Sequence, residues 1–236
     1  LPTATNTYYI TINSTDGTLQ SGTTVWTLED STLPVVMVKY NSTYTPTYFI
    51  AEERHTVSID RKMHKYLHST RGTQYVSGGQ LDGPAVRNAT DAGNVFGISA
   101  TTIADEDLSL NLDALTKPNG TTLTYNLFYR TSSTTWAWKP TEVPLKYNGA
   151  NFMEWDNNGT MTSGTTGNWY NTYVLFSDLD SSGRYSIIMG RGEFTTLASA
   201  QNENPLYFDW TGFPVAESVI AYQFNWRSNS AYTSKG

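Results

Sequence analysis

Cysteine is absent from the 236-residue sequence, which excludes a disulfide framework and a thiol nucleophile. Charged residues are also scarce, at 15%, against about 25% in typical soluble domains. No run of basic residues occurs and the formal net charge is -6, which argues against nucleic-acid binding because phosphates must be neutralised by Lys and Arg. No apolar run approaches the ~18 residues of a membrane-spanning helix. The sequence therefore predicts no nucleic-acid partner and no membrane insertion.

The sequence also has no initiating Met and no signal peptide, since it begins at Leu1 and ends at Gly236. We therefore expect the chain to be part of a longer polypeptide. Its composition shifts at a Gly/Ala/Asn-rich segment, residues 71–93. This shift predicts an N-terminal β-rich part over residues 1–70 and a C-terminal β-sandwich part over residues 94–236, joined by that segment.

Short stretches rich in Thr, Ser, Tyr and Val are what the chain does contain, and turn sequences separate them. The stretch 121–130 is an example, because its strand-like alternation follows the turn Pro118-Asn119-Gly120. Aromatic residues reach 14% of the chain, which is enough to build a core. We therefore predict an all-β fold, an antiparallel sandwich of the jelly-roll kind.

One segment departs from the β pattern and predicts a short helix near residues 59–70. Ile59, Met63, Tyr66 and Leu67 fall at helical spacing, and Gly72 can end the helix. A second segment, Thr73 to Ser77, predicts a short strand directly after it.

The same helix places His64 and His68 four residues apart, on one helix face. Such a pair can bind zinc, but the metalloprotease motif requires Glu directly after the first His, and Lys65 stands there. We therefore predict no metal ligands, with one histidine packed against a sheet and the other solvated. A metal site shared across a symmetry axis is the alternative.

Acidic residues form two candidate sites. The segment Asp178 to Gly183 resembles the start of a calcium loop, but Met189 occupies the position of the bidentate Glu, so a hairpin turn is favoured. The cluster Asp105-Glu106-Asp107 could supply a carboxylate pair for glycoside hydrolysis, with Asp105 and Asp107 on the same face of a strand. A solvated loop is the favoured interpretation, and Glu154 with Asp156 is an equally unspecific pair.

Tryptophans are the candidate ligand-binding residues. Trp136 and Trp138 lie two apart and should face the same side of a strand, where indole rings could stack on the apolar faces of sugar rings. Trp155 and Trp169 could extend this platform, and burial in a Trp-rich core is the alternative for each. No nucleophile elbow, phosphate-binding loop or dinucleotide fingerprint occurs. The sequence therefore predicts no catalytic residue, no cofactor and no enzymatic activity.

Three segments carry a resemblance to a known family. They are His64-Lys65-Tyr66-Leu67-His68-Ser69-Thr70-Arg71-Gly72-Thr73, Phe96-Gly97-Ile98-Ser99-Ala100 with the following Asp105-Glu106-Asp107, and the closing strand Ile220-Ala221-Tyr222-Gln223-Phe224. Through these segments, the chain from about residue 50 onward resembles tail-fibre and receptor-binding virion structural proteins of tailed bacteriophages. The resemblance implies an all-β, homotrimeric appendage of a virion. It identifies no receptor and no catalytic residue.

We therefore expect a tail-fibre or appendage domain on the virion surface that attaches the phage to host-surface glycans by non-covalent binding. Its expected partners are further copies of itself, other virion proteins and a host glycan. One alternative is a capsid, collar or shaft component that contacts only virion proteins. The other is a polysaccharide depolymerase, which would use carboxylates such as Asp105, Asp107 or Glu154.

Overall fold

The computed structural model describes residues 6–24, 32–41, 48–52, 61–83, 94–106, 108–117, 125–141, 143–146, 153–177 and 185–228. Within these ranges strands predominate, arranged in several antiparallel sheets with no closed barrel. The all-β prediction is therefore confirmed.

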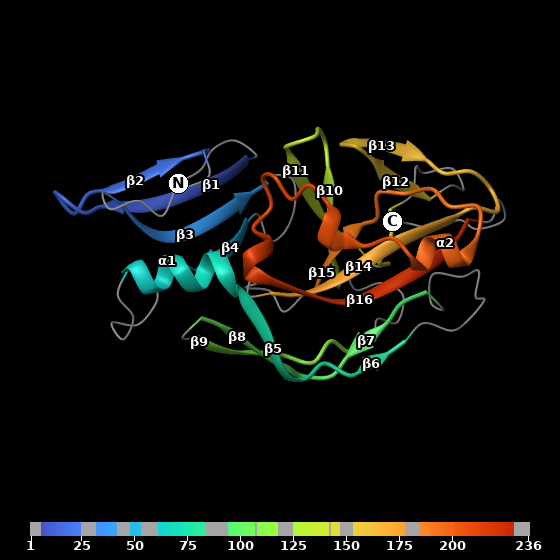
Figure 1. Cartoon of the computed structure of the whole chain (residues 1–236), viewed down its shortest axis with the longest axis horizontal. Coiled ribbons are helices and arrows are strands. Elements are labelled where there is room, and N and C mark those ends of the chain that lie inside the picture. Colours follow the sequence, from blue (N-terminus) through green and yellow to red (C-terminus); the bar gives the residue numbers. More distant parts are fainter. Residues whose placement is uncertain are drawn as a thin grey trace.

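A four-stranded sheet, the N-terminal sheet, has the order β2-β1-β3-β4 and is antiparallel throughout. Its strands are β1 (Asn6–Asn13), β2 (Leu19–Gly22), β3 (Thr32–Tyr40) and β4 (Tyr48–Glu52). In Figure 1 this sheet lies at one end of the long axis of the molecule, next to the helix α1 (Arg61–Thr70).

The central sheet has five strands in the order β11-β10-β15-β14-β16. They are β10 (Tyr125–Arg130), β11 (Trp136–Thr141), β14 (Trp169–Ser177), β15 (Tyr185–Met189) and β16 (Ser218–Arg227). The pair β10–β15 is parallel and the other three pairs are antiparallel. Residues 125–130 form the second half of the strand predicted over 121–130, and 121–124 lie outside the described residues.

Three smaller sheets complete the described structure. The hairpin sheet has the order β5-β8-β9, and the pairs β6–β7 and β12–β13 stand by themselves. Their bounds are β5 (Thr73–Gly78), β6 (Leu81–Asp82), β7 (Gly97–Ile98), β8 (Thr101–Asp105), β9 (Leu108–Leu112), β12 (Glu154–Asn157) and β13 (Thr160–Ser163). The strand predicted from Thr73 is therefore confirmed, and the described part of the 71–93 connection pairs with strands of the C-terminal part.

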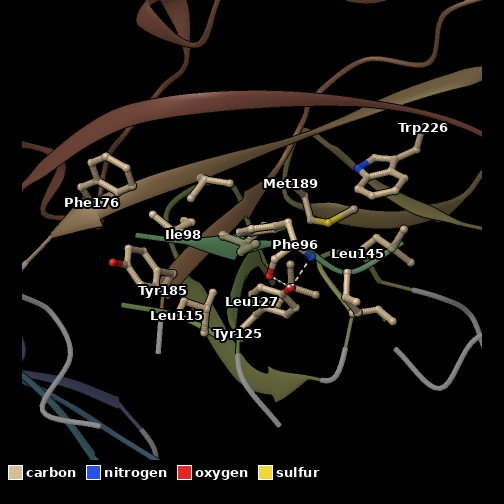
Figure 2. Close-up of a cluster of buried hydrophobic side chains, with 14 of the residues drawn as sticks. Phe96, Ile98, Leu115, Tyr125, Leu127, Leu145, Phe176, Tyr185, Met189 and Trp226 are labelled. Atoms are coloured by element: carbon tan, nitrogen blue, oxygen red, sulfur yellow. Dashed lines mark hydrogen bonds between the residues drawn. The ribbon is translucent and has the colours of Figure 1, made fainter. Parts of the chain in front are cut away.

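Apolar side chains cover both faces of the central sheet. On one face, Tyr125 and Leu127 of β10 join a cluster with Phe96. Figure 2 shows this cluster, in which the Tyr125 hydroxyl donates to the Phe96 carbonyl at 2.6 Å and accepts from the Phe96 amide at 2.7 Å. On the other face, Phe128 of the same strand packs in a cluster that includes Tyr9 and Met37 of the N-terminal sheet. Burial on both faces explains why successive residues are apolar in the middle of β14, Tyr173 to Phe176, and at the end of β15, Ile187 to Met189.

The C-terminus of α1 is fixed by Gly72. The amides of Arg71 and Gly72 both donate to the Leu67 carbonyl, at 2.7 and 3.2 Å, and Gly72 has a φ of +53°. This left-handed cap is the usual glycine-dependent end of a helix. A Cβ at Gly72 would lie 2.7 Å from the Ala216 carbonyl oxygen, in the short 3-10 helix η3 (Val215–Glu217). The helix end therefore packs directly against η3, although the two are far apart in the sequence.

Candidate functional site

The packed face of α1 contains both histidines. Along the helix His64, Leu67 and His68 are half-buried, whereas Met63 and Tyr66 are 48% and 61% exposed. The imidazoles themselves are only 12% and 20% exposed, and their ring centroids lie 5.9 Å apart. The helix and its shared histidine face are as predicted, but neither histidine is solvated.

Two buried carboxylates face these imidazoles. His64 Nε2 lies 3.5 Å from Glu106 Oε2, and His68 Nδ1 lies 3.3 Å from Glu106 Oε1. His68 Nδ1 is also 3.3 Å from Oε1 of Glu217. The Glu106 side chain is fully buried and that of Glu217 is 2% exposed. We call these four residues the His–Glu cluster.

Strand pairing places Glu106 beside the helix. β5 begins directly after α1 and pairs with β8 so that Thr73 lies opposite Asp105. The Thr73 hydroxyl donates to Asp105 Oδ1 at 3.1 Å, and Asp105 is 1% exposed. Glu106 follows in the β8–β9 turn with a φ of +47°, so its side chain leaves the strand direction and reaches the histidines.

Sequence reasoning considered Asp105 and Asp107 of the acidic cluster as a carboxylate pair and did not connect the cluster with the histidines. Asp105 is occupied by its bond to Thr73, and Asp107 lies outside the described residues. Glu106 is the carboxylate that meets the histidines, and Glu217, which no motif indicated, comes from η3. Over the described residues, His64, His68 and Glu106 form the group that could hold a metal ion, with one donor atom from each within 4.8 Å of the others.

Trp136 and Trp138 do face the same side of β11, as predicted, but that side is covered. They are 7% and 1% exposed and belong to one buried cluster. Trp210 stacks parallel to Trp136 at 6.1 Å between ring centroids, and Phe213 lies at 4.8 Å. The Trp136 indole nitrogen donates to the Thr211 carbonyl at 3.0 Å. Neither ring therefore offers an open face to a sugar in this structure.

Trp155 and Trp169 lie elsewhere and are half-buried. Trp155 is on β12 opposite Thr162 of β13 and packs against the edge of the Phe96 cluster. Trp169 begins β14, and its backbone exchanges two hydrogen bonds with Phe194, at 2.7 and 3.0 Å. The structure thus does not bring the four predicted tryptophans into one platform. Ligand binding by Trp155 and Trp169 stays a prediction.

The candidate catalytic carboxylates on β12 are held in ion pairs. Glu154 contacts the Lys146 ammonium group. Asp156 accepts two hydrogen bonds from Arg130, from Nε at 2.6 Å and from a terminal nitrogen at 3.1 Å, and both side chains are nearly fully buried. The calcium-like segment 178–183 lies outside the described residues.

An exposed aromatic residue stands on the connection between β15 and β16. Leu206 and Tyr207, in the 3-10 helix η2 (Pro205–Tyr207), are 76% and 86% exposed. The Asn204 side chain accepts from the Leu206 amide at 3.0 Å, and the Trp210 indole nitrogen donates to the Pro205 carbonyl at 3.2 Å. The backbone that carries Tyr207 is therefore fixed while its side chain projects outward.

Arg191 anchors the same connection to the central sheet. Its guanidinium lies 4.5 Å from the Phe208 ring centroid and donates to the Asp209 carbonyl at 2.5 Å. Burial and the neighbouring Arg130 lower the pKa of Arg191 to about 10, so it stays charged at neutral pH. We call Leu206, Tyr207 and this supporting backbone the η2 surface.

Comparisons with protein-family models, curated proteins and solved structures found no match for this chain. In the part of the chain that the structure describes, neither helix is both long and apolar enough to cross a membrane.

Proposed function

We propose that this chain is a non-enzymatic domain of a virion appendage, of the tail-fibre kind, that attaches the particle to host-surface glycans. The η2 surface carries this proposal, because Tyr207 is 86% exposed on a backbone held by its own hydrogen bonds. The resemblance of segments such as 64–73 to receptor-binding virion proteins supports the same function. Localisation on the virion surface follows from it.

Stacking on a sugar ring is the proposed mode of binding. The C–H face of a pyranose is apolar, and a tyrosine ring loses little conformational entropy when it becomes a contact. Leu206 adds exposed apolar area on the same 3-10 helix, while the exposed Asn202, Asn204 and Asp209 of the connection offer hydrogen bonds to hydroxyl groups. Several copies in one particle would raise a weak single-site affinity through multivalency.

Binding of a multivalent probe tests the proposal. Biotinylated protein on a streptavidin tetramer is incubated with host cells or with an array of their surface glycans. Tyr207→Ala should lower the bound signal about tenfold or more, because one lost aromatic contact of 1.4 kcal/mol already changes affinity tenfold. Tyr75→Ala is the matched control, since Tyr75 is also exposed but lies on β5. Equal binding by both variants and the unchanged protein would contradict the role of η2.

A second candidate function is assembly with other virion chains, including a homotrimer. Exposed apolar side chains favour it, because Met63 and Tyr66 on α1 are 48% and 61% exposed. Large exposed apolar groups are typical of contact surfaces. Light scattering on a sizing column measures the native mass, and Tyr66→Glu should convert a trimer to monomers if α1 forms the contact.

The depolymerase alternative receives less support from the described carboxylates. Asp105 bonds Thr73, Glu154 contacts Lys146 and Asp156 is bound by Arg130. Each is thus engaged by a neighbour within the fold. Release of reducing sugars from host polysaccharide by the purified protein would overturn the non-enzymatic assignment.

A further inference from the structure

The helix α1 packs with its imidazoles inward and two of its apolar side chains outward. Amphipathic helices normally bury their apolar face, which is the main source of their stability in a folded protein. In α1 the half-buried face contains Leu67 with His64 and His68, while Met63 and Tyr66 are exposed. Since this arrangement gives up apolar burial, the contact of the histidines with Glu106 must contribute to holding the helix in place.

The separations in this contact, one to each oxygen of Glu106, are longer than usual hydrogen bonds and close to the spacing of two ligands on one metal ion. An N–H···O hydrogen bond has its usual distance at about 2.9–3.0 Å, whereas the His–Glu atom pairs lie at 3.3 and 3.5 Å. Two ligands of a tetrahedral zinc ion, each about 2.0–2.1 Å from the metal, lie about 3.3 Å apart. We propose that His64, His68 and Glu106 bind one zinc ion within a single chain.

The chemistry of the donor set selects the class of metal. Two imidazole nitrogens and a carboxylate suit zinc and neighbouring transition metals, whereas calcium and magnesium prefer oxygen ligands alone. Glu217 places a second buried carboxylate 3.3 Å from the same His68 nitrogen. A dication would balance these two negative charges while both imidazoles stay neutral, as metal binding requires.

The ion would join two segments that are distant in the sequence. His64 and His68 belong to α1 and Glu106 to the β8–β9 turn. Glu217 of η3 lies beside them and faces His68, but it is not one of the three proposed ligands. A link of this kind stabilises the folded state, because the ligands are brought together only by folding. In a chain with no cysteine, it would serve the purpose that a disulfide serves elsewhere.

Direct binding to the unaltered protein is the first test. Protein stripped with EDTA is titrated with Zn²⁺ by calorimetry at pH 7.5, and Co²⁺ is added separately as a spectroscopic probe of coordination geometry. We expect one zinc ion per chain and the visible absorption of tetrahedral Co²⁺. A free zinc concentration of about 100 times the dissociation constant should raise the melting temperature by about 5–10 °C.

Variants then assign the ligands. His64→Gln and Glu106→Gln should each weaken zinc binding at least tenfold. Lys65→Ala is the matched control, since Lys65 is an exposed neighbour on the same helix and should leave the affinity unchanged. Far-UV circular dichroism before titration shows that each variant is folded, and the result for the unaltered protein does not depend on any variant.

Two outcomes would overturn the proposal. The first is the absence of saturable zinc binding by the unaltered protein up to about 100 µM, a level at which even a weak site would stabilise the fold. The second is zinc binding that both ligand variants retain in full. In either case the His–Glu cluster would be held by ion pairs between protonated imidazoles and the two carboxylates, without a metal ion. The His–Glu cluster does not include the η2 surface, so glycan binding can fail while zinc binding holds.

Discussion

The buried pair of Arg130 and Asp156 is expected to be the most sensitive ionic contact in the described structure. Arg130 donates two hydrogen bonds to Asp156, and the side chains are 1% and 2% exposed. The Gly159 amide donates a third bond to Asp156 Oδ1 at 2.7 Å. Asp156→Asn removes the charge but keeps the size, so the Arg130 guanidinium would remain buried without its carboxylate. Removing one partner of such a pair typically costs about 3–5 kcal/mol.

We therefore expect Asp156→Asn to lower the free energy of unfolding by about 3 kcal/mol. For a chain of this length that loss corresponds to a melting temperature about 6–12 °C lower. Urea denaturation followed by tryptophan fluorescence measures the free energy, and calorimetry measures the melting temperature. Asp113→Asn is the control, because Asp113 is exposed and should change neither value.

A double variant tests the reasoning more strictly. Arg130→Met with Asp156→Leu replaces the ion pair by apolar groups, so neither member of the pair is left as a buried charge. Arg191, whose Nε lies 3.7 Å from Asp156 Oδ2, loses this carboxylate but keeps its contact with the Asp209 carbonyl. The double variant should be more stable than the sum of the two single losses predicts, by at least about 2 kcal/mol. Part of the loss should remain because the Gly159 amide also loses its acceptor. Additive losses, or an Asp156→Asn variant as stable as the unaltered protein, would refute this account of the pair.

Three further predictions concern single groups. Burial lowers the pKa of Lys39 from 10.5 to about 7, so between pH 7 and 10.5 the unfolded chain binds more protons than the folded protein. The free energy of unfolding should therefore rise with pH in this range. Lys39→Met should abolish the rise, which chemical denaturation at pH 7 and pH 10 measures. Burial raises the pKa of Glu193, but hydrogen bonds from Tyr170, Thr165 and Asn168 outweigh this effect and lower the pKa from 4.5 to about 2. The charged carboxylate therefore stabilises the folded protein above about pH 4.5, and this stability is lost as the pH falls to about 2. Glu193→Gln should remove this contribution at neutral pH. Gly72→Ala should cost about 1–3 kcal/mol in thermal melts, because it forces a side chain into a left-handed conformation and towards the Ala216 carbonyl.

The sequence predicted local structure well and long-range contacts poorly. Helical spacing located α1, and the Ser/Thr/Tyr pattern located β5 and the described half of the 121–130 strand, because these signals depend on neighbouring residues. The same-side placement of Trp136 and Trp138 also follows from the two-residue period of a strand. The burial of both rings does not follow from this period, because it depends on residues about 75 positions later, such as Thr211.

The His–Glu cluster shows the same limit at the level of a site. His64 and His68 could be paired from helix geometry alone, but their acidic partner could not. Glu106 reaches them only because β5 and β8 pair with Thr73 opposite Asp105, a contact between residues 32 positions apart. Its left-handed backbone at the turn then directs its side chain out of the strand direction.

The connection from β15 to β16 links the two proposed sites. It covers Trp136 through Trp210 and Phe213, presents Tyr207, and supplies Glu217 to the His–Glu cluster.

Tyr207 should nevertheless bind independently of Glu217. Its backbone is held by Asn204 and Trp210, and Arg191 fixes Phe208 beside it, whereas Glu217 lies on η3 at the end of α1. Glu217→Gln should therefore weaken zinc binding and leave the attachment of streptavidin-linked protein to host glycans unchanged. Measuring both kinds of binding on this one variant separates the two sites. If Glu217→Gln also lost glycan binding, η3 and η2 would move as one unit, and the contacts of Arg191 would not isolate Tyr207 from the His–Glu cluster.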